Sequence, residues 1–283
     1  MNKNIQTFIG CDAEYDEADI VLHGVPFDGT TSFRPGTRFG PQAMRSESFG
    51  IETFSPYCEH DLTELSVFDA GDLELPFGAP AKMLSLVNER TAAFLKDGKA
   101  PLMLGGEHLI TLGAVQAMVQ KYPDLHVLHL DAHADLRDDY LGETLSHACV
   151  LRRVWELVGD GRIHQFGIRS GTREEFDFAA QHTQMRRFNL SGWEDTLRAL
   201  NGRPVYLTLD LDVLDPSGFC GTGTPEAGGI SFQALLDAVL TIGQTNLVGC
   251  DIVELSPHYD PSGASTAAAC KITREILLQM KGA

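Results

Sequence analysis

An α/β fold with a mostly parallel β-sheet is the architecture that the sequence predicts. Short, almost wholly apolar runs are typical of strands buried on both faces of a sheet. Amphipathic helical stretches alternate with these runs, as in folds whose helices cover a parallel sheet. No linker, repeat or low-complexity tract interrupts the 283 residues, so we expect one domain over 1–283. A closed eight-stranded barrel is the alternative, because its active face also lies at the carboxyl ends of the strands.

The strands are predicted where short apolar runs end at a glycine, a proline or an acidic residue. The first 18 residues are polar and are expected to form a loosely held arm or a short edge element. The expected strands are 20–26, 66–71, 101–104, 125–130, 162–168, 205–209 and 247–253.

The helices are predicted from apolar residues at helical spacing. Gly40-Pro41 opens a short first helix, with proline in the first turn where its missing N–H does no harm. The other expected helices are 81–95, 112–119, 150–157, 176–180, 193–200, 232–241 and 266–281.

The charge and the cysteine content limit the class of protein. A formal net charge of −17 argues against nucleic acid as the main partner, which requires a basic surface, and fits a cationic substrate or bound metal as well as a plain acidic surface. Six cysteines without a paired motif indicate reduced thiols in a cytoplasmic protein. There is no signal pattern, and no apolar run is long enough to span a membrane.

Potential metal ligands follow four of the predicted strands. Asp131-Ala132-His133-Ala134-Asp135 carries three of them on alternate residues, which point the same way in an extended chain. Carboxylates two residues apart follow another strand at 210–212, Gly105-Gly106-Glu107-His108 follows a third, and the fourth ends at Glu254. In open α/β sheets, ligands bind beyond the carboxyl ends of the strands. A strand end with turn-forming aspartates is the simpler interpretation of any one of these stretches.

Taken together, these stretches predict a dinuclear metal site. Mixed imidazole and carboxylate ligands suit Mn, Zn, Fe, Co or Ni better than Ca. Four carboxylates are too many for one catalytic zinc, and they fit two metals about 4 Å apart. The six candidate ligands are His108, Asp131, His133, Asp135, Asp210 and Asp212.

The chain resembles the ureohydrolase family of arginases, agmatinases and related guanidino-acid hydrolases. The resemblance implies an arginase-like three-layer α/β/α fold, two Mn²⁺ per subunit, and hydrolysis of a guanidinium to urea and an amine by a metal-bridging hydroxide. It also implies a trimer or hexamer. The matching segments, in family order, are 105–108, 131–135, Ser146-His147, 210–216, 221–226 and Glu254-Leu255-Ser256-Pro257.

The same resemblance implies a role for each ligand. The bridging ligands would be Asp131 and Asp210. The remaining ligands would serve one ion each, His108 with Asp135 and His133 with Asp212.

Three residues take catalytic roles by the resemblance. Asp135 would also accept a hydrogen bond from the hydroxide, and His147 would shuttle protons to the leaving amine. Glu254 would hold the guanidinium, whose fork of N–H donors fits a carboxylate. Two histidines within the strand, His126 and His129, are interpreted as core or pairing residues.

Agmatine is the expected substrate, with putrescine and urea as products, a step of polyamine biosynthesis. The stretches 26–38 and 167–175 resemble agmatinases, and Ser170 and Thr172 stand where arginases carry acidic residues. The loop 136–146 is acidic, and an acidic rim favours a cationic tail without a carboxylate.

Other functions are possible on the sequence alone. Guanidinobutyrase or formimidoylglutamase activity would be favoured by a basic residue at the mouth of the site, for which Arg137 and Arg169 are candidates. A two-metal phosphoesterase is disfavoured by the lack of a phosphate loop. A catalytically silent binding protein is disfavoured by the complete ligand set.

Overall fold

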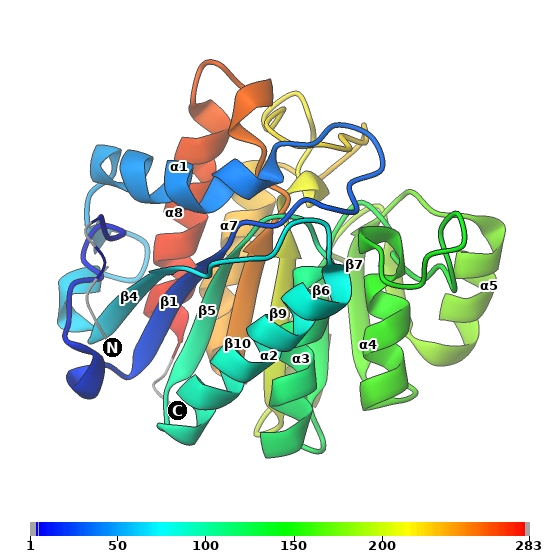
Figure 1. Ribbon diagram of the computed structural model, residues 1–283, viewed down its shortest axis with the longest axis horizontal. Coiled ribbons are helices and arrows are strands. Elements are labelled where there is room, and N and C mark those ends of the chain that lie inside the picture. The colour runs from blue at the N-terminus through cyan, green and yellow to red at the C-terminus, as the bar shows by residue number, and fades with distance from the viewer. Residues whose placement is uncertain (1–3, 5, 281–283) are drawn as a thin grey trace.

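One open, wholly parallel sheet of eight strands forms the centre of the molecule (Figure 1). The computed structural model describes residue 4 and residues 6–280. The strand order is β4-β1-β5-β10-β9-β6-β7-β8, and all neighbours in it are parallel. The strands are β1 (Ile20–Val25), β4 (Val67–Asp72), β5 (Ala100–Gly105), β6 (His126–Leu130), β7 (Ile163–Ile168), β8 (Gln184–Arg187), β9 (Pro204–Asp210) and β10 (Asn246–Val253). A separate antiparallel pair joins β2 (Phe54–Ser55) to β3 (His60–Asp61).

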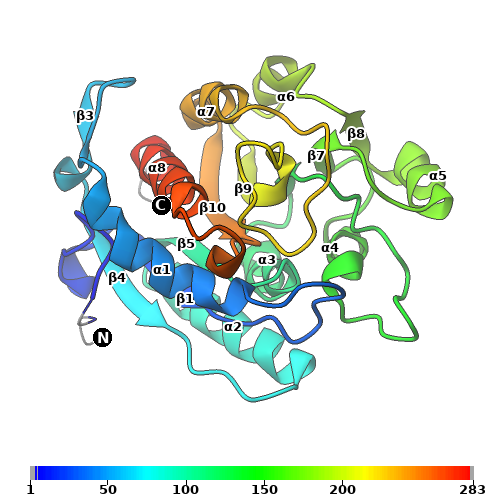
Figure 2. The same cartoon turned by 90° about the horizontal axis from the view of Figure 1, so that it is seen from above.

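Helices cover both faces of the sheet and complete three layers (Figure 2). One layer holds α2 (Pro80–Lys96), α3 (Ile110–Lys121) and α4 (Val150–Val158), and α5 (Arg173–His182) lies beside α4. The opposite layer holds α1 (Gly40–Glu47), α6 (Trp193–Ala199), α7 (Phe232–Thr241) and α8 (Ala264–Gln279). The predicted end of the last helix, Lys281, lies outside the described residues.

Two large hydrophobic cores, one on each face, explain why the sheet is open rather than a barrel. Alternate residues of a strand point to opposite faces, so Leu207 packs toward α7 and α8 while its neighbour Tyr206 packs toward α3. Nearly every residue of the central strands is buried, as expected for a parallel sheet between two helical layers. The predicted α/β/α class is confirmed, and the barrel alternative is wrong because β4 and β8 are the two edge strands of the sheet and do not pair with each other.

The structure differs from the predictions at both margins of the sheet. Of the two alternatives predicted for the segment before β1, the loose arm is wrong from residue 6 onward, because Phe8 and Cys11 are fully buried and the Phe8 N–H donates to Asp69, and the short edge element fits the structure. Asp12 also forms an antiparallel bridge to Phe68 on the edge strand β4. On the other margin, β8 was not predicted because its residues, Gln184–Arg187, are polar and mostly exposed.

The four strands that precede the candidate ligands are the four central strands, β5, β10, β9 and β6. The chain crosses from β5 to β6, and β9 and β10 later fill the gap between them. Parallel strands bring their carboxyl ends to one edge, which places all the candidate ligands at a single crevice. Within the described residues, no helix combines the length and the apolar character needed to cross a membrane.

Candidate metal centre and active site

The chain after β6 stays extended through the first ligand stretch. The Arg169 N–H donates to the carbonyl of Ala132, and the Ala134 N–H donates to Ser170, so this stretch is paired with the chain that follows β7. The extended backbone directs Asp131 and His133 to the same side, as the alternation predicted. The extension ends at Asp135, whose φ of 54° is left-handed and turns its carboxylate back toward His108.

The chain after β9 reaches the same point by a different route. Leu211–Val213 form a 3₁₀ turn, not an extended pair, and the Asp210 carboxylate caps this turn by accepting from the Asp212 N–H at 2.8 Å. The expected strand geometry is therefore wrong here. The physical reason is that Leu211 and Val213 are both fully buried, and a turn lets both reach the core while Asp212 faces the site.

The glycines before His108 bring three strand ends together. The Gly106 N–H donates to the carbonyl of Val25 at the end of β1, and the Gly106 carbonyl accepts from the Glu254 N–H after β10, both at 2.9 Å. A Cβ on Gly106 would lie 1.9 Å from the carbonyl oxygen of Phe27, so only glycine allows this approach.

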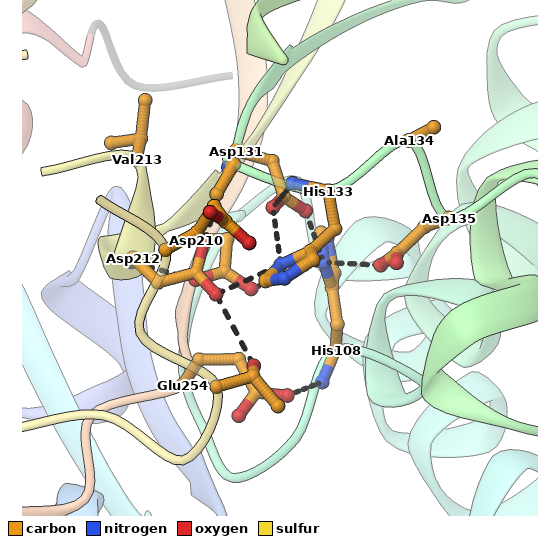
Figure 3. Close-up of polar contacts among 12 residues, drawn as sticks. His108, Asp131, His133, Ala134, Asp135, Asp210, Asp212, Val213 and Glu254 are labelled. Carbon is orange, nitrogen blue, oxygen red and sulfur yellow. Dashed lines mark hydrogen bonds and ion pairs between the residues drawn. The ribbon is translucent and has the colours of Figure 1, made fainter. Parts of the chain in front are cut away.

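All six predicted ligands converge (Figure 3). His108 Nδ1 lies 3.1 Å from carboxylate oxygens of Asp131 and Asp135 and 3.5 Å from Asp210. His133 Nδ1 lies 3.0 Å from Asp212 and 3.5 Å from Asp131. Five of the six side chains are buried, with His133 half-buried. Asp131 thus stands between two groups, one around each histidine.

The donor set fits metal ions. His108 Nε2 donates to Thr208, so in the neutral imidazole Nδ1 is a buried lone pair without a hydrogen-bond partner, and it faces three carboxylates. Lone pairs and carboxylate oxygens crowded together without donors repel one another, and a cation removes this conflict. The arrangement therefore has the chemistry of a metal site with histidine and carboxylate ligands.

The pKa shifts report the same crowding. Burial and the Asp131 charge raise the pKa of Asp135 to about 7. Burial and the charges of Asp212 and Asp131 raise the pKa of Asp210 well above its usual range. Burial alone would lower the pKa of His108, but the surrounding carboxylates raise it well above its ordinary value. Protons thus compete for the positions at which a metal cation would balance the charge.

Buried polar residues behind the ligands fix their orientation. Thr208 accepts from His108 Nε2 at 2.8 Å and donates to Asp251 at 2.6 Å, and Asp251 also accepts from Tyr206. On the other side, His129 accepts from Gln165 at 3.1 Å and donates to Asp131 at 2.8 Å. His129 lies close enough to Asp131 and His108 that these three side chains could together bind a metal ion. Because both of its ring nitrogens already have partners, we interpret it as an orienting residue.

His129 is the buried pairing residue that the sequence predicted, whereas Thr208, Asp251 and Gln165 were not predicted. A signal was present in Thr208 and Asp251, which are polar residues inside two apolar strands. They become directly opposed only in the observed register of β9 and β10, which the sequence does not reveal.

Glu254 lies beside the cluster on a strained backbone. Its φ of 67° is rare for a residue with a side chain, and its carboxylate accepts from the His108 N–H at 2.9 Å. Burial and the charge of Glu107 raise the pKa of Glu254 well above its usual range. The second carboxylate oxygen is not involved in that bond, and Glu254 lines the cavity above the cluster. A cation entering the cavity would relieve the buried charge.

A cavity of about 220 Å³ opens above the cluster, and His147 lies in its wall. Asp135 and Asp210 line the cavity together with His133 and Glu254, so three of the six predicted ligands face the same space as the predicted catalytic residues. Burial, with the nearby positive charge of His133 and His108, lowers the pKa of His147 to about 4. The imidazole is therefore neutral at pH 7 and able to accept a proton.

The mouth of the cavity is not the acidic rim that the sequence suggested. Asp138 pairs with Arg153 at 2.7 Å, and Asp139 accepts from the Gly142 N–H, so both are engaged outside the cavity. The wall instead contains Arg137, whose Nε lies 3.6 Å from Glu175 and whose guanidinium stacks on Tyr140. The argument from an acidic loop is therefore wrong.

Arg169, the other basic candidate, has a structural role. Its guanidinium donates to backbone carbonyls of Asp212, Glu226 and Val213 at 2.7–3.2 Å. It therefore ties the turn after β9 to the following loop. With its donors used in this way, it is not a tail-binding residue.

An open parallel sheet whose central strands direct histidines and aspartates to one buried cluster defines an arginase-like α/β/α protein with a metal site. The Arginase family profile matches residues 18–279. The agmatinase of Bacillus subtilis is 47% identical over 277 residues, covering 96% of each chain. The N(1)-aminopropylagmatine ureohydrolase of Thermococcus kodakarensis is 40% identical over 90% of this chain and 89% of its own. The crystal structure of the agmatine ureohydrolase of Thermoplasma volcanium matches with a TM-score of 0.87 at 33% identity, covering 98% of this chain and 94% of that one.

The chain belongs to the arginase family.

Proposed function

We propose that this protein is an agmatinase, which hydrolyses agmatine to putrescine and urea. The observation that carries the proposal is the convergence of six imidazole and carboxylate ligands beside a buried, cavity-lining Glu254. Relatives named agmatinase that are 45–47% identical over nearly the whole chain support the choice of substrate.

The six ligands would hold two Mn²⁺ ions, with Asp131 and Asp210 shared between them. Asp131 contacts both histidines, which fits a bridging position. Bound metal would supply Lewis acidity and a water-derived nucleophile at neutral pH. His108 and Asp135 would complete one metal position, and His133 and Asp212 the other.

Glu254 would bind the guanidinium of the substrate. A protonated guanidinium presents parallel N–H donors that match the two oxygens of a carboxylate. Because Glu254 is buried beside Glu107, an entering cation is stabilised there and keeps Glu254 ionised. This interaction would orient the central carbon toward the ligand cluster.

Asp135 and His147 would handle protons. Asp135 lies at the edge of the cluster and faces the cavity, so its carboxylate can accept a hydrogen bond from the nucleophile. The neutral ring of His147 can take up a proton and deliver it to the leaving amine, as general acid–base catalysis requires.

A second candidate substrate is 4-guanidinobutyrate, because Arg137 lies in the cavity wall and could bind a carboxylate tail. Glu175 at 3.6 Å already neutralises this guanidinium, which weakens its attraction for an anion. Because the charge of Arg137 is balanced at the mouth of the cavity and the chain has a net charge of −17, the cationic tail of agmatine is favoured.

The decisive experiment is a substrate panel on the Mn²⁺-loaded protein. Urea release would be measured with agmatine, arginine and 4-guanidinobutyrate, and we expect agmatine to have the highest kcat/KM. The matched variant Arg137→Gln should leave agmatine turnover largely intact. A preference for guanidinobutyrate that Arg137→Gln abolishes would instead establish the second candidate, and arginine as best substrate would reject the proposal.

We also propose a cytoplasmic homo-oligomer, a trimer or hexamer. None of the six cysteines, all of which lie in the described part of the chain, forms a disulfide, which suits a reducing compartment. Light scattering coupled to gel filtration would measure the subunit number.

A further inference from the structure

The loop after β1 is fastened to a buried carboxylate that has no role in the metal cluster. Glu107 is fully buried, between the β5 strand end and the ligand His108. It accepts hydrogen bonds from the Thr30 N–H at 2.8 Å, from the Thr30 hydroxyl, and from the Thr31 hydroxyl at 3.1 Å. Three bonds to one ionisable group make this loop a fixed part of the site, although Thr30 and Thr31 are themselves half-exposed.

The same loop holds His147 at two points. The hydroxyl of Thr30, which donates to Glu107, also accepts from the His147 N–H at 3.1 Å. The hydroxyl of Ser32 lies 3.0 Å from His147 Nε2. One hydroxyl thus fixes the backbone of His147 and the other its ring. A ring free to rotate about χ1 and χ2 would occupy several rotamers, and two contacts select one of them.

The far end of the loop is fastened as well. Arg34 donates to the carbonyls of Thr222 and Gly223 at 2.8 and 3.1 Å, just before Thr224 in the cavity wall. The loop therefore cannot swing away from the cavity without breaking contacts at both ends. Ser32 lies between these anchors and itself lines the cavity next to His147.

We propose that Thr30 and Ser32 are positioning residues that hold the His147 ring in the orientation required for proton transfer. The inference rests on the proposed function of His147 and goes beyond it, since neither hydroxyl belongs to the ligand set. Thr30 links the buried Glu107 to the backbone of His147 through hydrogen bonds, and the contact with Ser32 orients Nε2. Both therefore act on turnover rather than on substrate affinity.

The test is a double-mutant cycle on the Mn²⁺-loaded protein. Ser32→Ala and Thr30→Val should each lower kcat by about 5- to 20-fold, a part of the roughly 10²–10⁴-fold that a positioned acid–base group contributes, with KM within about twofold. Ser32→Thr and Thr30→Ser, which keep the hydroxyls, should restore most of kcat. Ser46→Ala, an exposed serine on α1, is the matched control and should have wild-type kcat.

The decisive arm places the same changes in a His147→Asn background. If the two hydroxyls act through His147, adding Ser32→Ala or Thr30→Val there should change kcat by less than about twofold. A full additional loss in that background would overturn the proposal, because the hydroxyls would then act independently of His147. Unchanged kcat in both single variants, with His147→Asn impaired, would also overturn it while leaving the role of His147 intact. If His147→Asn had wild-type kcat, His147 would have no role in proton transfer, and the proposed function of this residue would be wrong.

Discussion

Two acidic residues of the site have left-handed backbone conformations. Asp135 has φ of 54° and Glu254 has φ of 67°, and each conformation costs of order 1–3 kcal/mol for a residue with a side chain. The surrounding hydrogen bonds hold both in place, such as the Glu254 N–H donated to Gly106. Strain at these two positions directs one carboxylate toward His108 and the other into the cavity.

A shared ligand should affect both metal positions at once. Asp131 lies within 3.5 Å of both histidine rings, and Asp210 lies 3.5 Å from His108. Asp131→Asn or Asp210→Asn removes a negative charge from the cluster, so we expect loss of most bound metal and of at least about 10²-fold in kcat. Metal analysis by mass spectrometry and urea release measure the two effects. Full metal occupancy in either variant would contradict a bridging position.

Glu254→Gln should separate turnover from metal binding. The amide keeps an oxygen that can accept from the His108 N–H, so the cluster should stay assembled. The lost charge removes the guanidinium partner, and an unpaired buried cation costs about 2–5 kcal/mol, or at least about 30-fold in kcat/KM. We expect normal metal content with this loss of turnover, and equal kcat/KM for the variant and the wild type would reject the assignment.

At the level of elements, the site depends on how closely the strand ends approach one another. Gly106 joins the exits of β1, β5 and β10 through backbone hydrogen bonds. The loops carry the chemistry, while the parallel strands set the spacing between them.

Gly106→Ala is the corresponding test. The added methyl would meet the Phe27 carbonyl oxygen at 1.9 Å, and backbone must move to relieve the contact. We expect destabilisation by about 1–3 kcal/mol, as for overpacking, together with reduced metal affinity because His108 and Glu254 shift. Thermal melts and metal titration measure both. Gly50→Ala, whose Cβ would meet no atom within 4 Å, is the control and should behave like the wild type.

For the whole molecule, the cluster makes stability depend on metal and pH. In the metal-free chain the pKa of Asp135 is raised to about 7, and those of His108 and His133 are raised well above their ordinary values. Between pH 6.5 and 8 the unfolded groups lose their remaining protons while the folded state retains more of them, so through these groups the folded state binds more protons. Histidines with lowered pKa values, such as His147, act in the opposite sense, and their effect fades as the pH rises above 6.5 because the unfolded imidazoles deprotonate.

We accordingly expect the chelator-treated protein to lose stability as pH rises from 6.5 to 8. Mn²⁺ should reverse this trend, because the cation replaces the protons and binds only the folded site. Thermal melts at pH 6.5, 7.25 and 8, with and without metal, test the expectation. A Tm of the metal-free chain that rises over this range would contradict the assigned charge balance.

The sequence by itself determined the α/β class, seven of the eight strands of the main sheet, the helices, and six candidate ligands that the fold brings together, because apolar periodicity and polar residues after strands are local patterns. The sequence did not reveal features that depend on contacts between distant parts of the chain. The turn at Leu211–Val213 depends on two buried side chains, and the edge strand β8 lacks an apolar run. In the stretch 136–146, Asp138 and Asp139 are engaged outside the cavity, while Arg137 and Tyr140 line it.

Only the tertiary structure decided which strands are neighbours, and therefore which side chains face each other. The opposition of Thr208 and Asp251 arises from the register of β9 and β10. The attachment of His147 to Thr30 joins residues 117 positions apart. Packing across the sheet, rather than sequence spacing, sets these contacts, because the energy of burying both helical layers selects one strand order and one register.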